Sequence, residues 1–158
     1  MASGTLKTDH FVFPAYDVPA TLHFYSEVLG FPLTAAFSGD DWGGKAWLMM
    51  LFDVGDGRQM VLCALKGARR PRDDGLPADL RHYAFSVGSV RELDAWRKRL
   101  RAAKVKITEE DHGEQQSLYF PDPNGVVLEI TAPPSEQALE RDPGAATEVA
   151  RWLKEHAA

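Results

Sequence analysis

The sequence predicts an α+β fold made of two βαβββ modules followed by a C-terminal helix. The first observation is a repeat: adding 72 to His10 gives His82, and adding 72 to Asp17 gives Ser89. In each copy an apolar run that begins with histidine leads into a helix-capping residue. The second observation is that three extended runs, separated by turn residues, follow each helix pattern. We therefore expect two small sheets, packed or joined side by side, within one domain.

The expected boundaries follow from this repeat. We expect a single domain over 1–158, with the first module at 8–66, the second at 80–132 and a helical tail at 134–158. The stretch KGARRPRDDGLPADL, over 66–80, is polar and rich in Pro and Gly, as is typical of a linker.

The first module is expected to begin with a strand over HFVFP. Asp17 is a good N-cap, Pro19 suits a first helical turn, and Gly30 is expected to end the helix. The apolar positions expected on its buried side are Leu22, Tyr25 and Leu29. The extended runs that follow are FPLTAAF, KAWLMMLFDV and RQMVLCAL.

The second module repeats this order. The strand HYAFSV precedes Ser89, which forms a capping box with Glu92. After the helix ELDAWRKRLRAA come the expected strands VKI, SLYF and VVLEI, the last two joined by a turn at Pro123-Asn124-Gly125. In the tail, Asp142 is expected to cap a helix that docks on the body or on a second subunit. Its apolar stripe is Ala146, Val149, Trp152 and Leu153.

Composition excludes several classes of function. Eighteen Lys and Arg against 23 Asp and Glu give a net charge of −5, which disfavours binding to a phosphate backbone. The single cysteine, Cys63, cannot form an intramolecular disulfide, which suits a reducing compartment. No run is long and apolar enough for a membrane span, and MASGTLKTDH lacks the core of a signal peptide. We expect a cytoplasmic protein whose partner is a small molecule, not nucleic acid or membrane.

Three polar residues on apolar strands form a candidate metal site. Side chains alternate along a strand, so His10 shares a face with Val12 and His82 shares one with Ala84. Glu129 lies inside VVLEI, where a carboxylate is costly without a cation or hydrogen-bond donors. Two imidazoles and one carboxylate suit Fe(II), Mn(II), Zn(II), Co(II) or Ni(II), and the set does not choose among them. Taken singly, a histidine at the start of a strand is more often a core or hydrogen-bonded residue than a metal ligand.

The repeat also predicts that a fourth protein ligand is missing. Glu129 lies four residues after Gly125, and the residue four after Gly57 is Val61, which cannot bind a metal. Three protein ligands leave open positions for water or substrate, as in catalytic sites. Cys63 shares the face of Val61 and is expected to be a small buried hydrophobic residue.

These segments resemble the vicinal oxygen chelate superfamily, which includes glyoxalases, extradiol dioxygenases and fosfomycin-resistance transferases. DHFVFPAYDVPATLHFYSEVLGFPL is similar to its first strand and helix, and SLYFPDPNGVVLEI to its closing hairpin, over about residues 8 to 132. The resemblance implies paired βαβββ modules forming a U-shaped cleft around a divalent metal, with His10, His82 and Glu129 at the ligand positions. It also implies a homodimer, consistent with the amphipathic tail around Trp152.

Two further residues are candidates for catalysis. In the resembling dioxygenases and fosfomycin transferases a tyrosine at the position of Tyr119 points at the substrate, where a phenol can donate to an oxyanion. His112, in the loop EEDHGEQQ, is a candidate acid or base. The alternatives are an ordinary strand tyrosine and a solvated histidine. The residues expected to line either an apolar pocket, the core or an interface are Trp42, Trp47 and Met49.

The resemblance does not select one reaction. Glyoxalases usually use four protein ligands, and Val61 departs from that pattern. Extradiol dioxygenases use three, but the extra acid–base histidine that they carry has no counterpart between Leu51 and Leu80. In fosfomycin transferases a threonine, a lysine and an arginine surround the phosphonate. The corresponding residues here are Val12, Glu109 and Ala138. Glu109 is expected to repel an anionic phosphonate.

The leading hypothesis is a metal-dependent enzyme of the dioxygenase or glyoxalase-like group, acting on a small molecule that chelates through adjacent oxygens. Tyr119 would orient or polarise the substrate and His112 would shuttle a proton. The alternatives are a non-catalytic drug-binding protein similar to the bleomycin-resistance relatives, a fosfomycin-type transferase, and an interaction module that binds neither metal nor ligand.

Overall fold

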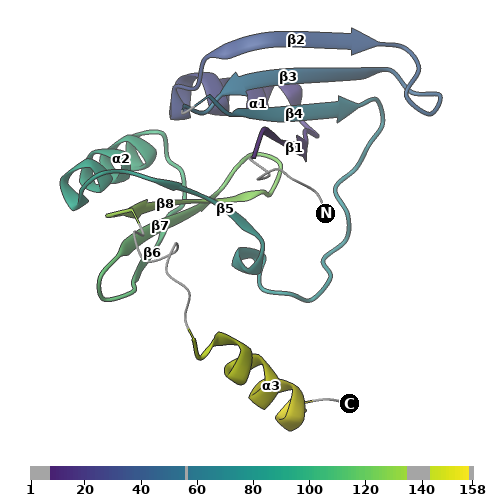
Figure 1. Ribbon diagram of the computed structural model, residues 1–158. Helices are drawn as coiled ribbons and strands as arrows, with labels where there is room; N and C mark the ends of the chain where they lie inside the picture. The colour runs from purple at the N-terminus through teal and green to yellow at the C-terminus, as the bar shows by residue number, and fades with distance from the viewer. Residues whose placement is uncertain (1–7, 56, 135–142, 157–158) are drawn as a thin grey trace.

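The chain folds into two four-stranded mixed sheets with helices, as expected for the α+β class (Figure 1). The computed structural model describes residues 8–55, 57–134 and 143–156. The first sheet has the strand order β1-β4-β3-β2 and the second has the order β5-β8-β7-β6. In both sheets the first and last strands of the module are parallel neighbours, and the other pairs are antiparallel. The repeat in the sequence therefore corresponds to the same strand order in both sheets.

The elements lie close to their expected positions. The first module contains β1 (His10–Pro14), α1 (Val18–His23), the π-helical segment η1 (Phe24–Leu29), β2 (Leu33–Gly39), β3 (Trp47–Asp53) and β4 (Gln59–Leu65). The second contains the 3₁₀ turn η2 (Ala78–Leu80), β5 (His82–Ser86), α2 (Val90–Ala102), β6 (Thr108–Asp111), β7 (Gln116–Pro121) and β8 (Val127–Ala132). Helix α3 (Ala145–His156) follows.

One strand was expected too early in the chain. The segment VKI does not pair, and β6 begins at Thr108. Lys104 adopts a left-handed conformation, with φ of 59°, and the amide of Val105 donates to the carbonyl of Leu100. Val105 and Ile107 pack against the core as the chain leaves α2. These apolar side chains therefore pack against the core after the end of α2, and their segment does not pair as a strand of the sheet.

The first helix begins and ends where its capping residues predict, but its buried side differs. The Asp17 carboxylate accepts a hydrogen bond from the Ala20 amide, and Gly30 ends η1 with φ of 77°. Leu22 is exposed, whereas its neighbour Thr21 is buried against the second module. Adjacent residues on a helix point about 100° apart, so burial of Thr21 turns Leu22 outward.

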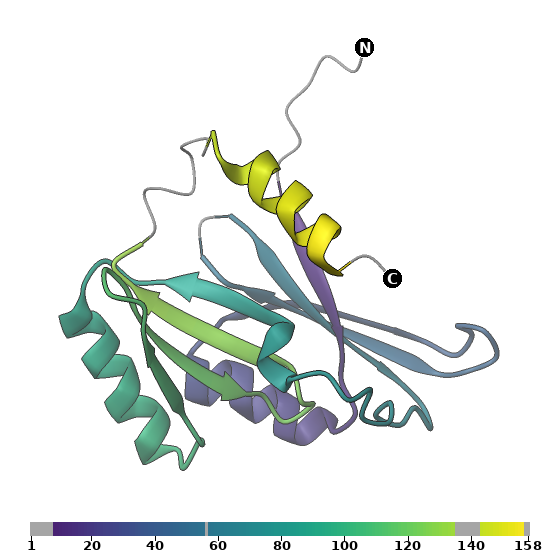
Figure 2. The same cartoon turned by 90° about the horizontal axis from the view of Figure 1, so that it is seen from below.

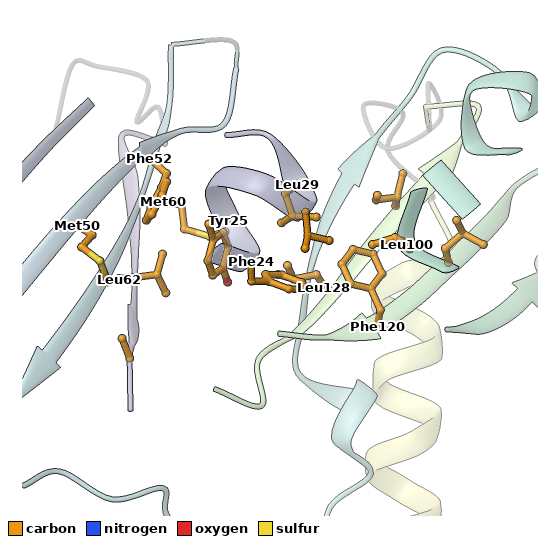
Figure 3. Packing of buried hydrophobic residues seen from close by; sticks show 14 of the residues in the cluster. Phe24, Tyr25, Leu29, Met50, Phe52, Met60, Leu62, Leu100, Phe120 and Leu128 are labelled. Carbon is orange, nitrogen blue, oxygen red and sulfur yellow. The ribbon is translucent and has the colours of Figure 1, made fainter. Parts of the chain in front are cut away.

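The core lies between the two sheets, with α1 and η1 wedged into it (Figure 3). The ring of Tyr25 lies 5.4 Å from that of Phe52 in the first sheet. The ring of Phe24 lies 6.4 Å from that of Phe120 in the second sheet. Leu93 and Leu100 of α2 are also fully buried in this cluster. Each sheet thus covers a common core with its inner face.

Buried hydrogen bonds fix how the modules pack. In the β7–β8 turn, Asn124 donates to the Thr21 hydroxyl at 2.9 Å and accepts from the Tyr16 amide at 2.8 Å. Beside it the Tyr25 phenol donates to Asp122 at 3.1 Å. Burial, followed by the charge and hydrogen bond of Asp122, raises the pKa of Tyr25, so the phenol remains a donor. Because each buried group left unpaired costs about 1–3 kcal/mol, this turn holds the second sheet in one orientation against the first helix.

The face of each sheet opposite the core points outward. Burial alternates along β1 and β5, so that His10 and His82 are exposed while the residues next to them face inward. The two edge strands meet through Phe11 and Tyr83, whose ring centroids are 4.2 Å apart. The outward surfaces are called here the outer face of the first sheet, which carries His10, and the outer face of the second, which carries His82.

Helix α3 stands away from both sheets, as Figures 1 and 2 show. None of its described residues is buried, and Val149, Trp152 and Leu153 are all more than half exposed. Docking on the body of the same chain is therefore wrong for these residues, and docking on a second subunit stays a prediction. The proposed cap, Asp142, lies outside the described residues. Over the described ranges, no helix combines the length and the apolar character that a membrane span requires.

Candidate metal centre

His82 and Glu129 meet on the outer face of the second sheet. They lie on β5 and β8, which are parallel neighbours with Ala84 opposite Glu129 and His82 opposite Val127. The His82 Nε2 atom is 3.0 Å from Oε2 of Glu129. Only 7% of Glu129 is exposed, although it faces outward. Two of the three expected ligands are therefore already in contact.

The backbone before β5 selects the tautomer of His82. Its Nδ1 atom lies 2.6 Å from the carbonyl oxygen of Asp79, in the turn η2. A carbonyl oxygen only accepts, so Nδ1 must carry the hydrogen in this contact. In the neutral imidazole, Nε2 then holds a lone pair, which is the form in which histidine binds a metal.

With hydrogen on Nδ1 of His82, the space between its Nε2 atom and the Glu129 carboxylate favours a cation. A lone pair on His82 Nε2 and an ionised carboxylate are both acceptors, so they repel unless positive charge lies between them. Without a metal, a shared proton supplies that charge. A divalent ion can replace the proton, because its ligands are the same nitrogen and oxygen in their deprotonated forms. The donor set thus fits a divalent metal.

In His10, as in His82, Nδ1 contacts an oxygen acceptor, but His10 lies on a different face. Its Nδ1 atom donates to the Asp9 carboxylate at 2.6 Å, which again leaves Nε2 as the lone-pair nitrogen. However, His10 lies on the outer face of the first sheet. Within the described ranges, no group of three or more His, Cys, Asp or Glu side chains is arranged to hold a metal ion. The three expected ligands do not converge within one chain, because the core separates the two outer faces.

Around His10, the outer face of the first sheet is apolar. Val12 pairs in register with Val61, and Pro14 pairs with Cys63, which places both of these β4 residues on the face of His10. Neither valine can bind a metal, as the sequence predicts. The other apolar side chains of this face include Ala35, Phe37, Trp47, Met49, Leu51 and Leu65. Trp42 lies in the β2–β3 connection, with its ring 6.0 Å from that of Trp47.

Tyr119 lies beside the His82–Glu129 pair. It is directly opposite Glu129 in the β7–β8 ladder, and its ring packs edge-on against that of His82 at 5.3 Å. Burial, the negative charge of Glu129 and a hydrogen bond to that carboxylate raise the pKa of Tyr119. The phenol therefore stays protonated and donates toward the candidate metal centre.

His112 also lies near this centre. Its backbone amide donates to the carbonyl of Gln115, which closes the β6–β7 hairpin. Its Nε2 atom is 3.4 Å from the Tyr119 hydroxyl and 3.7 Å from the carboxylate of Glu110. The candidate acid or base is therefore connected to the metal centre through the phenol.

Glu109 does not face the site, contrary to the expectation that it repels a phosphonate. It pairs in register with the buried Leu118, on the inner face. Its carboxylate accepts hydrogen bonds from Arg97 and Arg101 of α2, at 3.0 and 2.8 Å. Its charge is thus directed away from the outer face and balanced by two arginines. The third position compared, Ala138, lies outside the described residues.

Sequence reasoning missed three groups of the site. Asp9 could have been noticed, because an acidic residue next to a candidate histidine ligand is a typical hydrogen-bond partner. The Asp79 carbonyl leaves no signal in the sequence, since any residue has a carbonyl. Glu110 was not distinguished from Glu109, because only the register of β6 decides which of the two faces Tyr119.

A partly open pocket of about 460 Å³ lies elsewhere, between the modules. Its lining includes Arg58, Phe31, Tyr83, Phe85 and Trp96, but none of the candidate metal ligands. Tyr83 and Phe85 point to the side of β5 opposite His82. The candidate metal centre is instead an open surface.

Comparisons with known proteins agree with the fold described above. The sequence model described as the Glyoxalase/Bleomycin resistance protein/Dioxygenase superfamily matches residues 7–130. The chain is 28% identical over 124 residues to the glutathione transferase FosA of Serratia marcescens, covering 77% of each protein.

Solved structures with this fold include enzymes with different activities. The fosfomycin resistance protein FosX of Listeria monocytogenes, in complex with Mn(II) and 1S,2S-dihydroxypropylphosphonic acid, has a TM-score of 0.61 at 21% identity, covering 89% of this chain and 100% of that one. Glyoxalase I of Leishmania major has a TM-score of 0.60 at 21% identity, covering 96% and 97%. At these identities the structures show the fold and do not select a reaction.

Proposed function

The chain belongs to the Glyoxalase/Bleomycin resistance protein/Dioxygenase superfamily, and we propose that it is a divalent-metal-dependent enzyme acting on a small molecule with adjacent oxygen atoms. The observation that carries the proposal is the contact at 3.0 Å between His82 Nε2 and Glu129. Because the Asp79 carbonyl takes the hydrogen on Nδ1, these two acceptors need a cation between them. A buried carboxylate paired in this way is costly for stability alone, which favours a functional role.

We infer that the third ligand is His10 of a second copy. In both histidines an oxygen accepts the hydrogen on Nδ1, which leaves Nε2 as the nitrogen that can bind a metal, yet they lie on outer faces that point away from a common core. In a dimer with twofold symmetry, the outer face of the first sheet of one copy can lie against that of the second sheet of the other. Two equivalent sites then form, each with His82 and Glu129 from one chain and His10 from its partner.

The same pairing accounts for the exposed apolar surface. Val12 and Phe37 on the outer face of the first sheet are 53% and 56% exposed. An apolar surface of this kind marks a ligand or subunit interface more often than a solvated surface. In the proposed dimer it forms the wall opposite His82 and Glu129, where it excludes water and holds the apolar part of a substrate.

Three protein ligands leave positions for two substrate oxygens. Held by His82, Glu129 and the partner's His10, a divalent ion would supply Lewis-acid stabilisation of negative charge on those oxygens. Tyr119 can then act on the substrate, because its phenol is protonated and lies beside Glu129. It donates a hydrogen bond to the charged oxygen of the substrate, and His112 supports it from the solvent side.

A dioxygenase or a glyoxalase-like lyase is the leading candidate, and a second candidate is supported by a separate observation. The 28% identity to a glutathione transferase supports transfer of a thiol to an electrophile such as an epoxide. The inward direction of Glu109 removes the charge repulsion expected against a phosphonate. Val12 remains different from the threonine of the fosfomycin transferases.

The reaction class can be tested with metal-reconstituted protein. We expect turnover with one of three substrate sets: catechols, methylglyoxal–thiol adducts, or epoxides with glutathione. Oxygen uptake that is lost under anaerobic conditions identifies a dioxygenase, whereas activity without oxygen separates the lyase and transferase by product. A chelator should abolish the activity, and Glu129→Gln should not respond to added metal. Metal-independent ligand binding without turnover would instead favour the drug-binding alternative.

A further inference from the structure

We propose that Glu110 is a positioning residue of the site, which holds His112 in the tautomer with hydrogen on Nε2 and so turns the Tyr119 hydroxyl hydrogen toward Glu129 and the substrate. The inference deepens the proposed function, on which its catalytic meaning rests. Glu110 lies on β6 opposite Ser117, on the same outer face as Tyr119. The three side chains form a row that leads from solvent to the candidate metal centre.

The first argument concerns what surrounds His112 Nε2. This nitrogen lies 3.7 Å from the Glu110 carboxylate and 3.4 Å from the Tyr119 hydroxyl. An ionised carboxylate only accepts hydrogen bonds. A lone pair on Nε2 would face that negative charge, whereas a hydrogen there is attracted by it. Glu110 therefore favours the Nε2–H tautomer, as carboxylates that orient histidines do elsewhere.

The second argument comes from the other side of the phenol. The Tyr119 hydroxyl has one hydrogen, and Glu129, directly opposite in the β7–β8 ladder, is a carboxylate that can accept it. The phenol oxygen can then only accept from His112. This arrangement fits hydrogen on Nε2, and because the phenol hydroxyl can rotate, its direction follows the tautomer that Glu110 favours. Both neighbours of the imidazole are thus satisfied by the same tautomer.

The consequence is a directed hydrogen-bond chain. His112 donates to Tyr119, and Tyr119 donates inward. If His112 carried its hydrogen on Nδ1, the phenol would donate outward to Nε2 and offer only its oxygen to the site. Glu110 therefore determines whether the site presents a donor or an acceptor to the substrate. The hairpin supports this placement, because the His112 amide is fixed to Gln115 and the Gly113 amide to Asp111.

The chain offers a matched control for Glu110. Glu109 is its neighbour on the same strand and carries the same charge, but it faces α2 and bonds to Arg97 and Arg101. Glu109→Gln removes the same charge at one residue's distance without touching His112. Both carboxylates are partly exposed, so we expect both variants to fold.

The test is a long-range ¹H–¹⁵N correlation spectrum of full-length, metal-free, ¹⁵N-labelled protein at about pH 9, where an ordinary imidazole is neutral. The His112 signals are assigned by their absence in His112→Gln. In the unmodified protein we expect Nε2 to be protonated and Nδ1 to be bare. Glu110→Gln should lose this preference, because its amide can donate to Nε2, and Glu109→Gln should retain it.

Three outcomes would overturn the inference: hydrogen mainly on Nδ1 in the unmodified protein, an unchanged spectrum in Glu110→Gln, or an equal change in Glu109→Gln. None of these depends on a metal. Failure of the metal centre and failure of the tautomer assignment are therefore separate results.

Discussion

Replacing His82 with alanine should abolish stoichiometric metal binding while leaving the chain folded. The unmodified protein is expected to bind about one divalent ion per chain, as sites of this donor set do. Changing even a residue that only orients a metal ligand costs roughly 10–100-fold in affinity, so loss of a ligand should weaken binding at least 100-fold. Metal analysis of purified protein, followed by calorimetric titration with Mn(II) and Zn(II), measures the effect.

Thermal unfolding gives an independent reading of the same change. At a metal concentration of about 100 times Kd, binding should stabilise the unmodified protein by roughly 2.7 kcal/mol, and this gain should vanish in His82→Ala. His23→Ala is a suitable control, because His23 lies on α1 away from the site. Full metal retention by His82→Ala would remove the proposed mechanism, whatever the activity of the protein.

A mixture of two inactive variants should recover metal binding. His10→Ala removes the ligand on the first sheet, and Glu129→Gln removes one on the second. Each variant alone is expected to lose its metal. A heterodimer purified through two different tags should contain one intact site, with His10 from one chain and His82 and Glu129 from the other, or about half of the normal stoichiometry.

This experiment distinguishes a metal site shared between two copies from a metal site within one chain. If all three ligands came from one chain, both chains of the heterodimer would carry a broken site and no metal would return. A double variant, His10→Ala with Glu129→Gln, provides the control when it is paired with either single variant. No recovery in the tagged heterodimer would rule out a site shared between copies.

Much of the fold was predictable because it depends on local patterns. Apolar alternation defined β1 and β5 to within a residue, and Asp17 and Ser89 cap their helices as expected. The sequence also predicted that His82 and Glu129 lie close together, because the repeat places them on the first and last strands of one module, which are parallel neighbours. Local periodicity and duplication carry this information.

The remaining features depend on packing between distant segments. Wedging of α1 between the sheets, which sends His10 and His82 to separate outer faces, follows from contacts such as Asn124 with Thr21. The direction of Glu109 follows from the register of β6 and from Arg97 on α2. No sequence pattern encodes such long-range contacts, so the sequence predicted three ligands in one place, whereas the described residues place His10 and His82 on different outer faces.

The most direct measurement is anomalous diffraction at the zinc edge from crystals of the full-length protein grown with Zn(II). We expect one strong peak per chain, within about 2.0–2.2 Å of Nε2 of His82, an oxygen of Glu129 and Nε2 of His10 from a second copy. A peak that lacks any of these three ligands, or density showing that His82 and Glu129 share no ion at saturating zinc, would contradict the account.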